Sequence, residues 1–159
     1  MPSLRIIESS DGPPDDAFSG IEASLIKLLE SPDDSGAVDT VDAALSYAVR
    51  LRATDVYFEP WDDCCALRYR IDGILHDVAK LPKAHHARIV ARVKILARMI
   101  TYQRDTPQDG RIDADATPCA RVIRVSAFPT VNGERMVLRI MDGAGCLIDL
   151  GALGFDAVL

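Results

Sequence analysis

The chain has 159 residues, of which 48% are hydrophobic and 26% are charged, a composition ordinary for one soluble globular domain. Charges interrupt every long apolar run, and residues 1–10 lack the basic-then-apolar pattern of an export signal, so we expect a cytoplasmic protein without a membrane span. The net charge of −6 and the absence of a basic stripe studded with aromatics argue against a nucleic-acid-binding protein.

Acidic and basic side chains are unevenly distributed along the chain. Residues 1–42 carry ten acids and two bases, whereas residues 80–98 carry six bases and no acid. Opposed blocks of this kind often face each other or face a partner protein. We expect the basic block on a solvated or intersubunit face.

The cysteines and histidines give no sign of a metal site. No CxxC pair is present, and two adjacent cysteines have poor geometry for a chelate or a mutual disulfide. Two neighbouring histidines on a helix cannot face the same metal ion, and we expect them on the surface. The residues concerned are Cys64, Cys65, Cys119, Cys146, His85 and His86.

Two helices are predicted in the first third of the chain, after an N-terminal arm. Residues 1–38 are expected to form an acidic arm or linker with one short helix, because apolar residues at helical spacing begin at Ile21 and Ser31-Pro32 ends the pattern. A second amphipathic helix is expected from Asp39 or Thr40 to about Arg52.

Strands and one further helix follow. Residues 55–60 read as a short strand, and residues 67–71 alternate before the Asp72-Gly73 turn, which predicts a hairpin with a return strand over 74–81. The ranges predicted after that are a helix over 84–101, strands over 121–128 and 134–141 around Asn132-Gly133, a closing segment over 142–145 and the start of a connection over 146–159. This order indicates an α+β fold over residues 39–145, with an antiparallel sheet and flanking helices.

The second hairpin places several arginines on one face. If Asn132-Gly133 forms the turn, opposed positions sum to 265, so that Ser126 faces Arg139 and Arg124 lies diagonal to Arg139, about 7–8 Å away at the backbone. Like charges so placed repel unless an anion or a carboxylate lies between them, and guanidinium groups suit phosphate oxygens. This face is therefore a candidate anion site; the alternative is a solvated sheet face with local carboxylate partners. Its polar residues are Arg124, Ser126, Arg135 and Arg139.

Four ordered stretches resemble signatures of one protein family, the type II secretion and type IV pilus assembly ATPases. Residues 53–60 (ATDVYFEP) are similar to that family's ASDIHxEP, with Tyr57 where His is usual, and residues 68–73 (RYRIDG) to its RxRIDG. Residues 106–111 (TPQDGR) resemble LPQDGR, and the run from Arg124 to Arg139 resembles RVSxxPxxxGExxVxRxL.

The resemblance implies a PAS-like domain that precedes a RecA-like motor domain in a hexameric ATPase. It implies that Arg124 and Arg139 contact the terminal phosphate of a nucleotide held between the two domains, with Arg111 and Arg135 as possible accessory residues. The full-length family members use ATP and Mg²⁺. Their expected partners are the motor domain and the platform proteins of the inner membrane, to which the protein would be peripheral.

No GxxxxGK[ST] motif is present, so this chain alone is not expected to hydrolyse ATP and no catalytic residue is assigned to it. An alternative is a stand-alone binding module that docks to or inhibits such an ATPase or its membrane platform. Asp55 and Glu59 are expected to be structural, as a capping carboxylate and as an exposed partner for a strand arginine.

Overall fold

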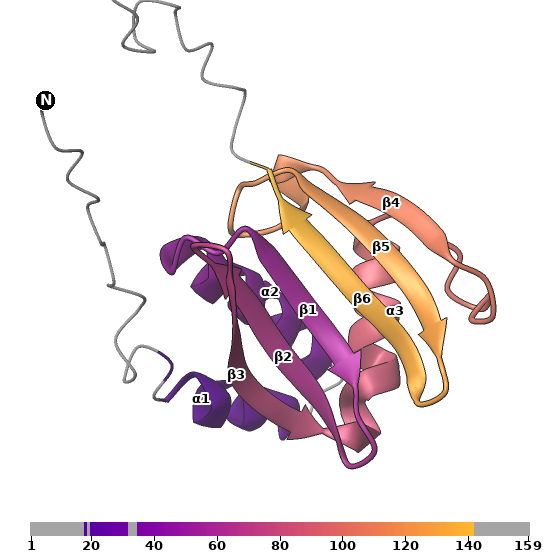
Figure 1. The fold of residues 1–159 in the computed structure, drawn as a ribbon, viewed down its shortest axis with the longest axis horizontal. Coiled ribbons are helices and arrows are strands. Elements are labelled where there is room, and N and C mark those ends of the chain that lie inside the picture. Colours follow the sequence, from indigo (N-terminus) through magenta and orange to yellow (C-terminus); the bar gives the residue numbers. More distant parts are fainter. Residues whose placement is uncertain (1–17, 19, 32–34, 142–159) are drawn as a thin grey trace, which may run out of the picture.

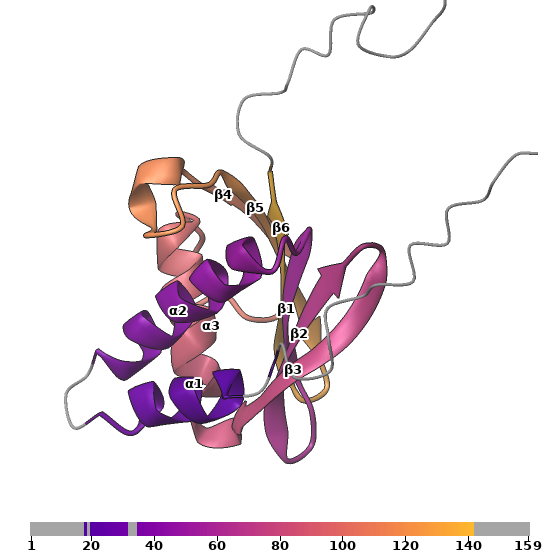
Figure 2. The same ribbon diagram turned by 90° about the vertical axis from the view of Figure 1, so that its left-hand side faces the viewer.

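The computed structural model describes residue 18, residues 20–31 and residues 35–141. Within these ranges, three α-helices lie on one face of a six-stranded antiparallel sheet of order β3-β2-β1-β6-β5-β4, and the other face of the sheet carries no helix (Figures 1 and 2). The predicted α+β fold with an antiparallel sheet and flanking helices is confirmed. The elements are α1 (Ile21–Leu29), α2 (Gly36–Arg50), β1 (Asp55–Pro60), β2 (Cys64–Ile71), β3 (Ile74–Pro82), η1 (Lys83–His85), α3 (His86–Leu96), β4 (Gln108–Ile112), η2 (Ala114–Ala116), β5 (Ile123–Thr130) and β6 (Gly133–Ile140).

The helices α1 and α2 pack against each other at a glycine. A Cβ on Gly36 would meet the backbone oxygen of Leu28 at 2.7 Å, so only glycine permits this close approach. The helix α2 starts there, before the predicted Asp39; Ser35 precedes it and its hydroxyl donates to the Asp39 carboxylate at 2.6 Å.

The helix α1 belongs to the same hydrophobic core as the sheet. Ile21, Leu25 and Leu29 are buried there together with residues of α2, including Val41 and Leu45. The three residues of α1 reach the core together because their spacing of about one helical turn places them on one side of the helix. The division of the chain at residue 39 stays a prediction, and residues 1–17 and 142–159 lie outside the described residues.

The first hairpin has the predicted turn. Asp72 and Gly73 have φ values of 49° and 82°, and Ile71 pairs with Ile74 across the turn. Two successive positive φ values are typical of the two-residue turn that Asp-Gly favours, because its twist matches that of the strands.

The register predicted for the second hairpin is wrong by two residues. Thr130 pairs with Gly133, so that the turn residues are Val131 and Asn132, and opposed positions sum to 263. The side chain of Thr130 closes this turn: its hydroxyl donates to the Gly133 oxygen at 2.6 Å and accepts from the Asn132 amide at 3.3 Å. Gly133, with φ of 129°, becomes the first residue of β6.

The helix α3 ends at Leu96, earlier than the predicted end at Thr101. Arg98 adopts a left-handed conformation with φ of 56°, and the Met99 amide donates back to the Lys94 oxygen at 2.8 Å. This is the Schellman arrangement that terminates helices.

None of the helices in residues 18, 20–31 and 35–141 is long and apolar enough to cross a membrane.

The strand β4 was not predicted, because aspartate and glycine disfavour strands. The side chain of Gln108, its first residue, bonds the loop that follows α3, accepting from the Ile100 amide at 2.9 Å and donating to the Gln103 oxygen at 2.8 Å. A Cβ on Gly110 would meet the Ala97 oxygen at 2.5 Å, so the edge strand lies close against the end of α3.

Candidate anion site on the open face of the sheet

A row of charged residues crosses the face of the sheet that no helix covers. In order across five strands, β2, β1, β6, β5 and β4, the directly opposed residues are Arg70, Asp55, Arg139, Arg124 and Arg111. Directly opposed residues in antiparallel strands have Cβ atoms about 4.5–5.5 Å apart. The row therefore places four guanidinium groups and one carboxylate on five adjacent strands, each residue beside the next.

The alternation of side chains along each strand explains why these residues share one face of the sheet. Their neighbours Val125 and Leu138 point the other way and are buried under the helices, with exposed fractions of 1% and 0%. Because side chains alternate with a period of two, a register shift of two residues leaves every residue on its predicted face. The predicted polar face with Arg124, Ser126 and Arg139 is therefore found, although Arg124 lies directly opposite Arg139 rather than diagonal to it.

Arg139 is held by a buried carboxylate. Its Nε donates to Oδ1 of Asp55 at 2.9 Å, while the hydroxyl of Thr54 donates to Oδ2 at 2.9 Å and the Nε of Arg70 lies 3.6 Å from Oδ2. The side chain of Asp55 is 3% exposed and that of Arg139 is 67% exposed. The hydrogen bond that Arg139 donates to Asp55 raises the pKa of the Arg139 guanidinium. Asp55 thus orients Arg139 while leaving most of its side chain accessible.

Arg124 is exposed and makes no hydrogen bond or ion pair with another described residue. It lines, together with Arg139 and Asp55, a hollow of about 330 Å³ whose other lining residues are Ser126, Phe128 and Val137. The structure therefore brings the two predicted arginines into one hollow.

The two predicted accessory arginines do not line this hollow. Arg111 stands at the β4 end of the row, with its Nε 3.3 Å from Oδ1 of Asp113. Arg135, further along β6, forms an ion pair with Glu59 and lies over the ring of Tyr57, with its guanidinium carbon 5.8 Å from the ring centroid.

Glu59 was expected to be exposed and is not, since its exposed fraction is 8%. It forms ion pairs with Arg68, at 3.3 Å, and with Arg135. Tyr57 is covered by two arginines: the guanidinium carbon of Arg70 lies 5.7 Å from the centroid of its ring, in addition to that of Arg135. Arginine guanidinium groups thus contact two buried residues of β1 on a face that carries no helix, which alternation of polar and apolar residues does not predict.

The basic helix α3 also differs from expectation at two positions. Lys94, predicted within a solvated basic face, is fully buried, and its ammonium pairs with Glu134 and donates to the Gln103 oxygen at 2.8 Å. His86, predicted on the surface, is only 6% exposed, and Gly133 lies against the Nε2–Cδ2 edge of its ring, where a Cβ would come within 3.2 Å of Nε2. Within the part of the chain that the structure describes, Arg92 of the basic block contacts Asp42 of the acidic block at 3.5 Å.

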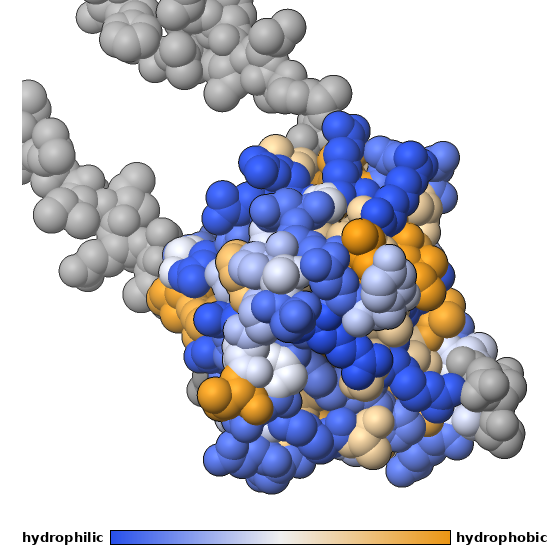
Figure 3. All heavy atoms as spheres, turned by 90° about the vertical axis from the view of Figure 1, so that its right-hand side faces the viewer, coloured by the Kyte–Doolittle hydropathy of each residue, from blue (hydrophilic) through white to orange (hydrophobic). Residues whose placement is uncertain are grey.

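The chemistry that this face supports is anion binding. Two guanidinium groups, of which one has no partner among the described residues, match the oxygens of a phosphate or carboxylate. Within the described ranges, no group of three or more His, Cys, Asp or Glu residues could hold a metal ion. Seen from the β4 side, the surface is mostly hydrophilic, with apolar atoms in separate patches (Figure 3).

Comparison with known proteins places the chain in a family. The sequence pattern described as "Type II/IV secretion system protein" matches residues 30–158. The chain belongs to this family. The family resemblance predicted from the four sequence motifs is thereby confirmed, and in the structure these motifs form β1, the end of β2 with its turn, the start of β4, and the β5–β6 hairpin.

Several members of the type II/IV secretion system family are similar to this chain. The type II secretion system protein HxcR of Pseudomonas aeruginosa is 39% identical over 127 residues, which are 80% of this chain and 27% of that protein. The type II secretion system ATPase E of Vibrio cholerae is 33% identical over 96% of this chain and 31% of its own length. The type IV pilus assembly ATPase PilB of Myxococcus xanthus is 32% identical over 98% of this chain and 28% of its own length. The chain thus spans less than a third of these relatives.

Proposed function

We propose that this chain is the regulatory and assembly domain of a hexameric secretion or pilus assembly ATPase, and that Arg124 and Arg139 contact the terminal phosphate of ATP bound by a motor domain. The observation that supports this most strongly is the position of the two arginines. They are directly opposed on β5 and β6 and share one open hollow.

The electrostatics of the row favour an anionic occupant. Like charges directly opposite in a sheet destabilise it, and here Arg111, Arg124 and Arg139 follow one another on adjacent strands. Asp55 compensates Arg139 and Asp113 lies beside Arg111, but Arg124 has no carboxylate among the described residues. A phosphate oxygen between Arg124 and Arg139 would relieve the repulsion, and each charge-assisted contact would contribute about 1.5–3 kcal/mol.

The open face allows a second domain to supply that phosphate. In this proposal the motor domain carries ATP and Mg²⁺, and closure of the motor domain onto the β1–β6–β5 surface brings the terminal phosphate to the arginines. They would stabilise the charge that develops during hydrolysis, as an arginine finger does. Hydrolysis would then be coupled to movement between the domains, and platform proteins would hold the assembly at the inner membrane.

The test uses the full-length polypeptide that carries this chain. Arg124→Ala and Arg139→Ala should each lower ATP turnover at saturating ATP by roughly 10–100-fold, the effect of losing one charge-assisted contact. Arg98→Ala is a matched control, since Arg98 is 83% exposed and does not line the hollow. Turnover that is unchanged in both variants would contradict the proposal.

The intact mass of the native polypeptide decides how this assay is assembled. A mass well above 17.3 kDa means that the motor domain is on the same chain, and the variants are made there. A mass of 17.3 kDa means that the chain must be added to a separate motor protein before turnover is measured.

A further inference from the structure

Two of the four sequence stretches that resemble family signatures take no part in the proposed phosphate contact. Residues 53–60 lead into and form β1, and residues 68–73 form the end of β2 and its turn. The two stretches meet on the open face of the sheet, where Asp55 lies directly opposite Arg70. Because Asp55 also lies opposite Arg139 on its other side, it stands between the two arginines.

Arg70 is fixed by acceptors within the chain. Its Nε and Nη2 donate to the hydroxyl oxygen of Tyr57 at 3.3 and 3.1 Å, and its Nη1 donates to the backbone oxygen of Gly73 at 3.0 Å. The guanidinium carbon also lies 5.7 Å from the centroid of the Tyr57 ring. Each nitrogen of the guanidinium thus has an acceptor, so Arg70 is held against β1 although its side chain is 36% exposed.

The carboxylate of Asp55 divides its two oxygens between the arginines. Oδ1 accepts from Nε of Arg139 at 2.9 Å. Oδ2 accepts from the hydroxyl of Thr54 at 2.9 Å and lies 3.6 Å from Nε of Arg70. The side chain of Asp55 is 3% exposed, and a buried carboxylate needs opposite charge and hydrogen-bond donors around it. The oxygen that does not accept from Arg139 is therefore already occupied.

This division leaves the end of the Arg139 guanidinium available. Arg139 binds Asp55 through Nε, and its two terminal nitrogens have no hydrogen-bond partner among the described residues. An arginine tends to pair with both oxygens of a carboxylate through two parallel hydrogen bonds, which would engage a terminal nitrogen. Occupation of Oδ2 by other donors disfavours that second bond. It thereby keeps the terminal nitrogens of Arg139 free for a ligand in the hollow.

We propose that Arg70 is a positioning residue for Arg139. It occupies the side of Asp55 that faces away from Arg139, so that Asp55 orients the Arg139 guanidinium through Nε without drawing its terminal nitrogens out of the hollow. Residues 53–60 then supply the carboxylate, and residues 68–73 supply the cation that holds it. The effect of Arg70 on ATP turnover rests on the proposed function of Arg139, whereas its effect on the pair of Asp55 and Arg139 does not.

The first test needs no nucleotide. The side-chain Nε–H groups of arginine are observed by ¹⁵N NMR in the 159-residue chain, and the signal of Arg139 is the one that disappears in Arg139→Lys. Arg70→Gln should shift this signal and slow the exchange of the terminal N–H groups of Arg139, because pairing with both oxygens restrains them. An Arg139 signal identical in Arg70→Gln and the unmodified chain would overturn the proposal.

Arg68→Gln is the matched control for this spectrum. Arg68 lies two residues before Arg70 on the same face of β2, and its side chain is 25% exposed. It pairs with Glu59 and Asp77 rather than with Asp55. The Arg139 signal should therefore be unchanged in Arg68→Gln, and an equal shift in both variants would overturn a specific role for Arg70.

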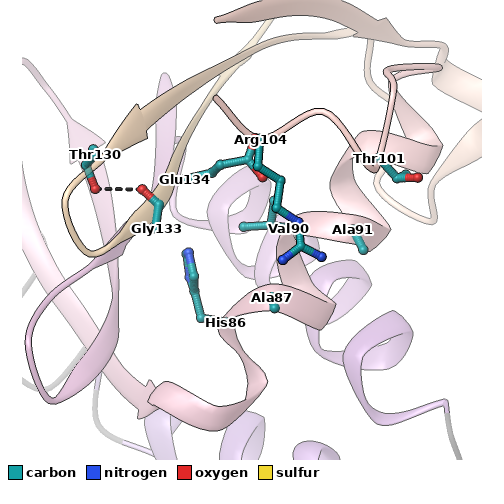
Figure 4. Close-up of a pocket in the computed structure, with 9 residues that line it drawn as sticks. All are labelled: His86, Ala87, Val90, Ala91, Thr101, Arg104, Thr130, Gly133 and Glu134. Atoms are coloured by element: carbon teal, nitrogen blue, oxygen red, sulfur yellow. Dashed lines mark hydrogen bonds between the residues drawn. The ribbon is translucent and has the colours of Figure 1, made fainter. Parts of the chain in front are cut away.

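The second test measures ATP turnover by the full-length polypeptide. Arg70→Gln should lower turnover at saturating ATP roughly 3–10-fold, less than Arg139→Ala does, because a misplaced contact retains part of its effect. In the Arg139→Ala background the same substitution should have no further effect, since Arg70 acts only through Arg139. Arg104→Gln controls for the loss of one positive charge and should leave turnover unchanged, because Arg104 lines a separate hollow beside α3 (Figure 4).

The outcomes for turnover distinguish the positioning role from the phosphate contact. If Arg139→Ala leaves turnover unchanged, the phosphate contact is contradicted, and the NMR signal of Arg139 alone decides the role of Arg70. If Arg139→Ala lowers turnover but Arg70→Gln does not, the positioning role is overturned and the phosphate contact stands. The positioning role is also overturned if Arg70→Gln lowers turnover by the same factor with and without Arg139.

Discussion

Arg139 on β6 donates from Nε to Oδ1 of Asp55 on β1 at 2.9 Å, directly across the strand pair, and the accepting carboxylate is 3% exposed. The opposing residue on the other side, Arg124, has no such partner among the described residues. One arginine of the pair is therefore oriented before any anion arrives, whereas the other is free to move toward it. Asp55, expected from the sequence to be only structural, positions a residue of the candidate site.

Asp55→Asn should lower the free energy of unfolding by about 1–3 kcal/mol, because the buried group that accepts from Thr54 and Arg139 loses its charge and one acceptor position. Urea denaturation measures this. Asp77→Asn is the matched control, since Asp77 also pairs with a strand arginine but its side chain is 64% exposed. Equal losses in the two variants would show that burial of Asp55 does not matter.

Lys94→Met should lower the free energy of unfolding by about 3–5 kcal/mol, because it leaves the charge of Glu134 buried without a partner. The double variant Lys94→Met with Glu134→Leu should recover most of that loss, since an apolar pair of similar volume often replaces a buried ion pair at little cost. Denaturant titration of the single and double variants forms the comparison. A double variant as unstable as Lys94→Met would contradict the assignment of the loss to an unpaired charge.

His86 should make the fold less stable in mild acid. Burial lowers its pKa in the folded chain below the ordinary value of 6.5. Below pH 6.5 the unfolded chain therefore binds this proton more readily, and stability falls as pH drops from 6.5 through the folded pKa. The other charged groups near His86 are unchanged in the variants compared below, so they do not account for a difference between those variants. These groups are Lys83, Lys94, Arg104 and Glu134.

The measurement for His86 is the unfolding free energy at about pH 7.5 and about pH 5.5, either side of the ordinary histidine pKa. His86→Gln should lose part of the decrease between these two conditions. His85→Gln, at the neighbouring position in η1, should retain it. The same pH dependence in all three proteins would mean that His86 is not the group responsible.

Gly110→Ala should destabilise the fold by about 1–3 kcal/mol, the usual effect of overpacking, because its Cβ would meet the Ala97 oxygen at 2.5 Å and the Met99 side chain at 3.0 Å. Thermal unfolding monitored by circular dichroism detects this. Arg111→Ala, next along β4, removes only an exposed ion pair and should cost about 0–1 kcal/mol. If Gly110→Ala matches that small loss, β4 does not lie so close to the end of α3.

Patterns with a local physical cause could be predicted from the sequence. The β2–β3 hairpin follows from alternation and the conformational preference of Asp72-Gly73, and the shared face of Arg124 and Arg139 follows from the period of a strand. The prediction of that face is correct despite the error in register, because a shift of two residues leaves each side chain on the same side of the sheet.

Features that depend on distant contacts could not be predicted in this way. At the turn of Val131 and Asn132, the side-chain amide of Asn132 donates to Oδ1 of Asp62, 70 positions earlier, at 2.8 Å. The burial of Lys94 depends on Glu134, 40 positions later, and that of His86 on the approach of Gly133 to the edge of its ring. The strand β4 forms against local propensity because β5 pairs with it along its whole length. In each case tertiary structure overrides a local preference.

The affinity of the full-length protein for ATP compared with ADP tests the central proposal most directly, because the two nucleotides differ by the phosphate that Arg124 and Arg139 are proposed to contact. We predict that Arg124→Ala and Arg139→Ala each weaken the binding of ATP roughly tenfold or more while changing the binding of ADP little. Equal weakening of ATP and ADP, or no change in either, would contradict a contact with the terminal phosphate.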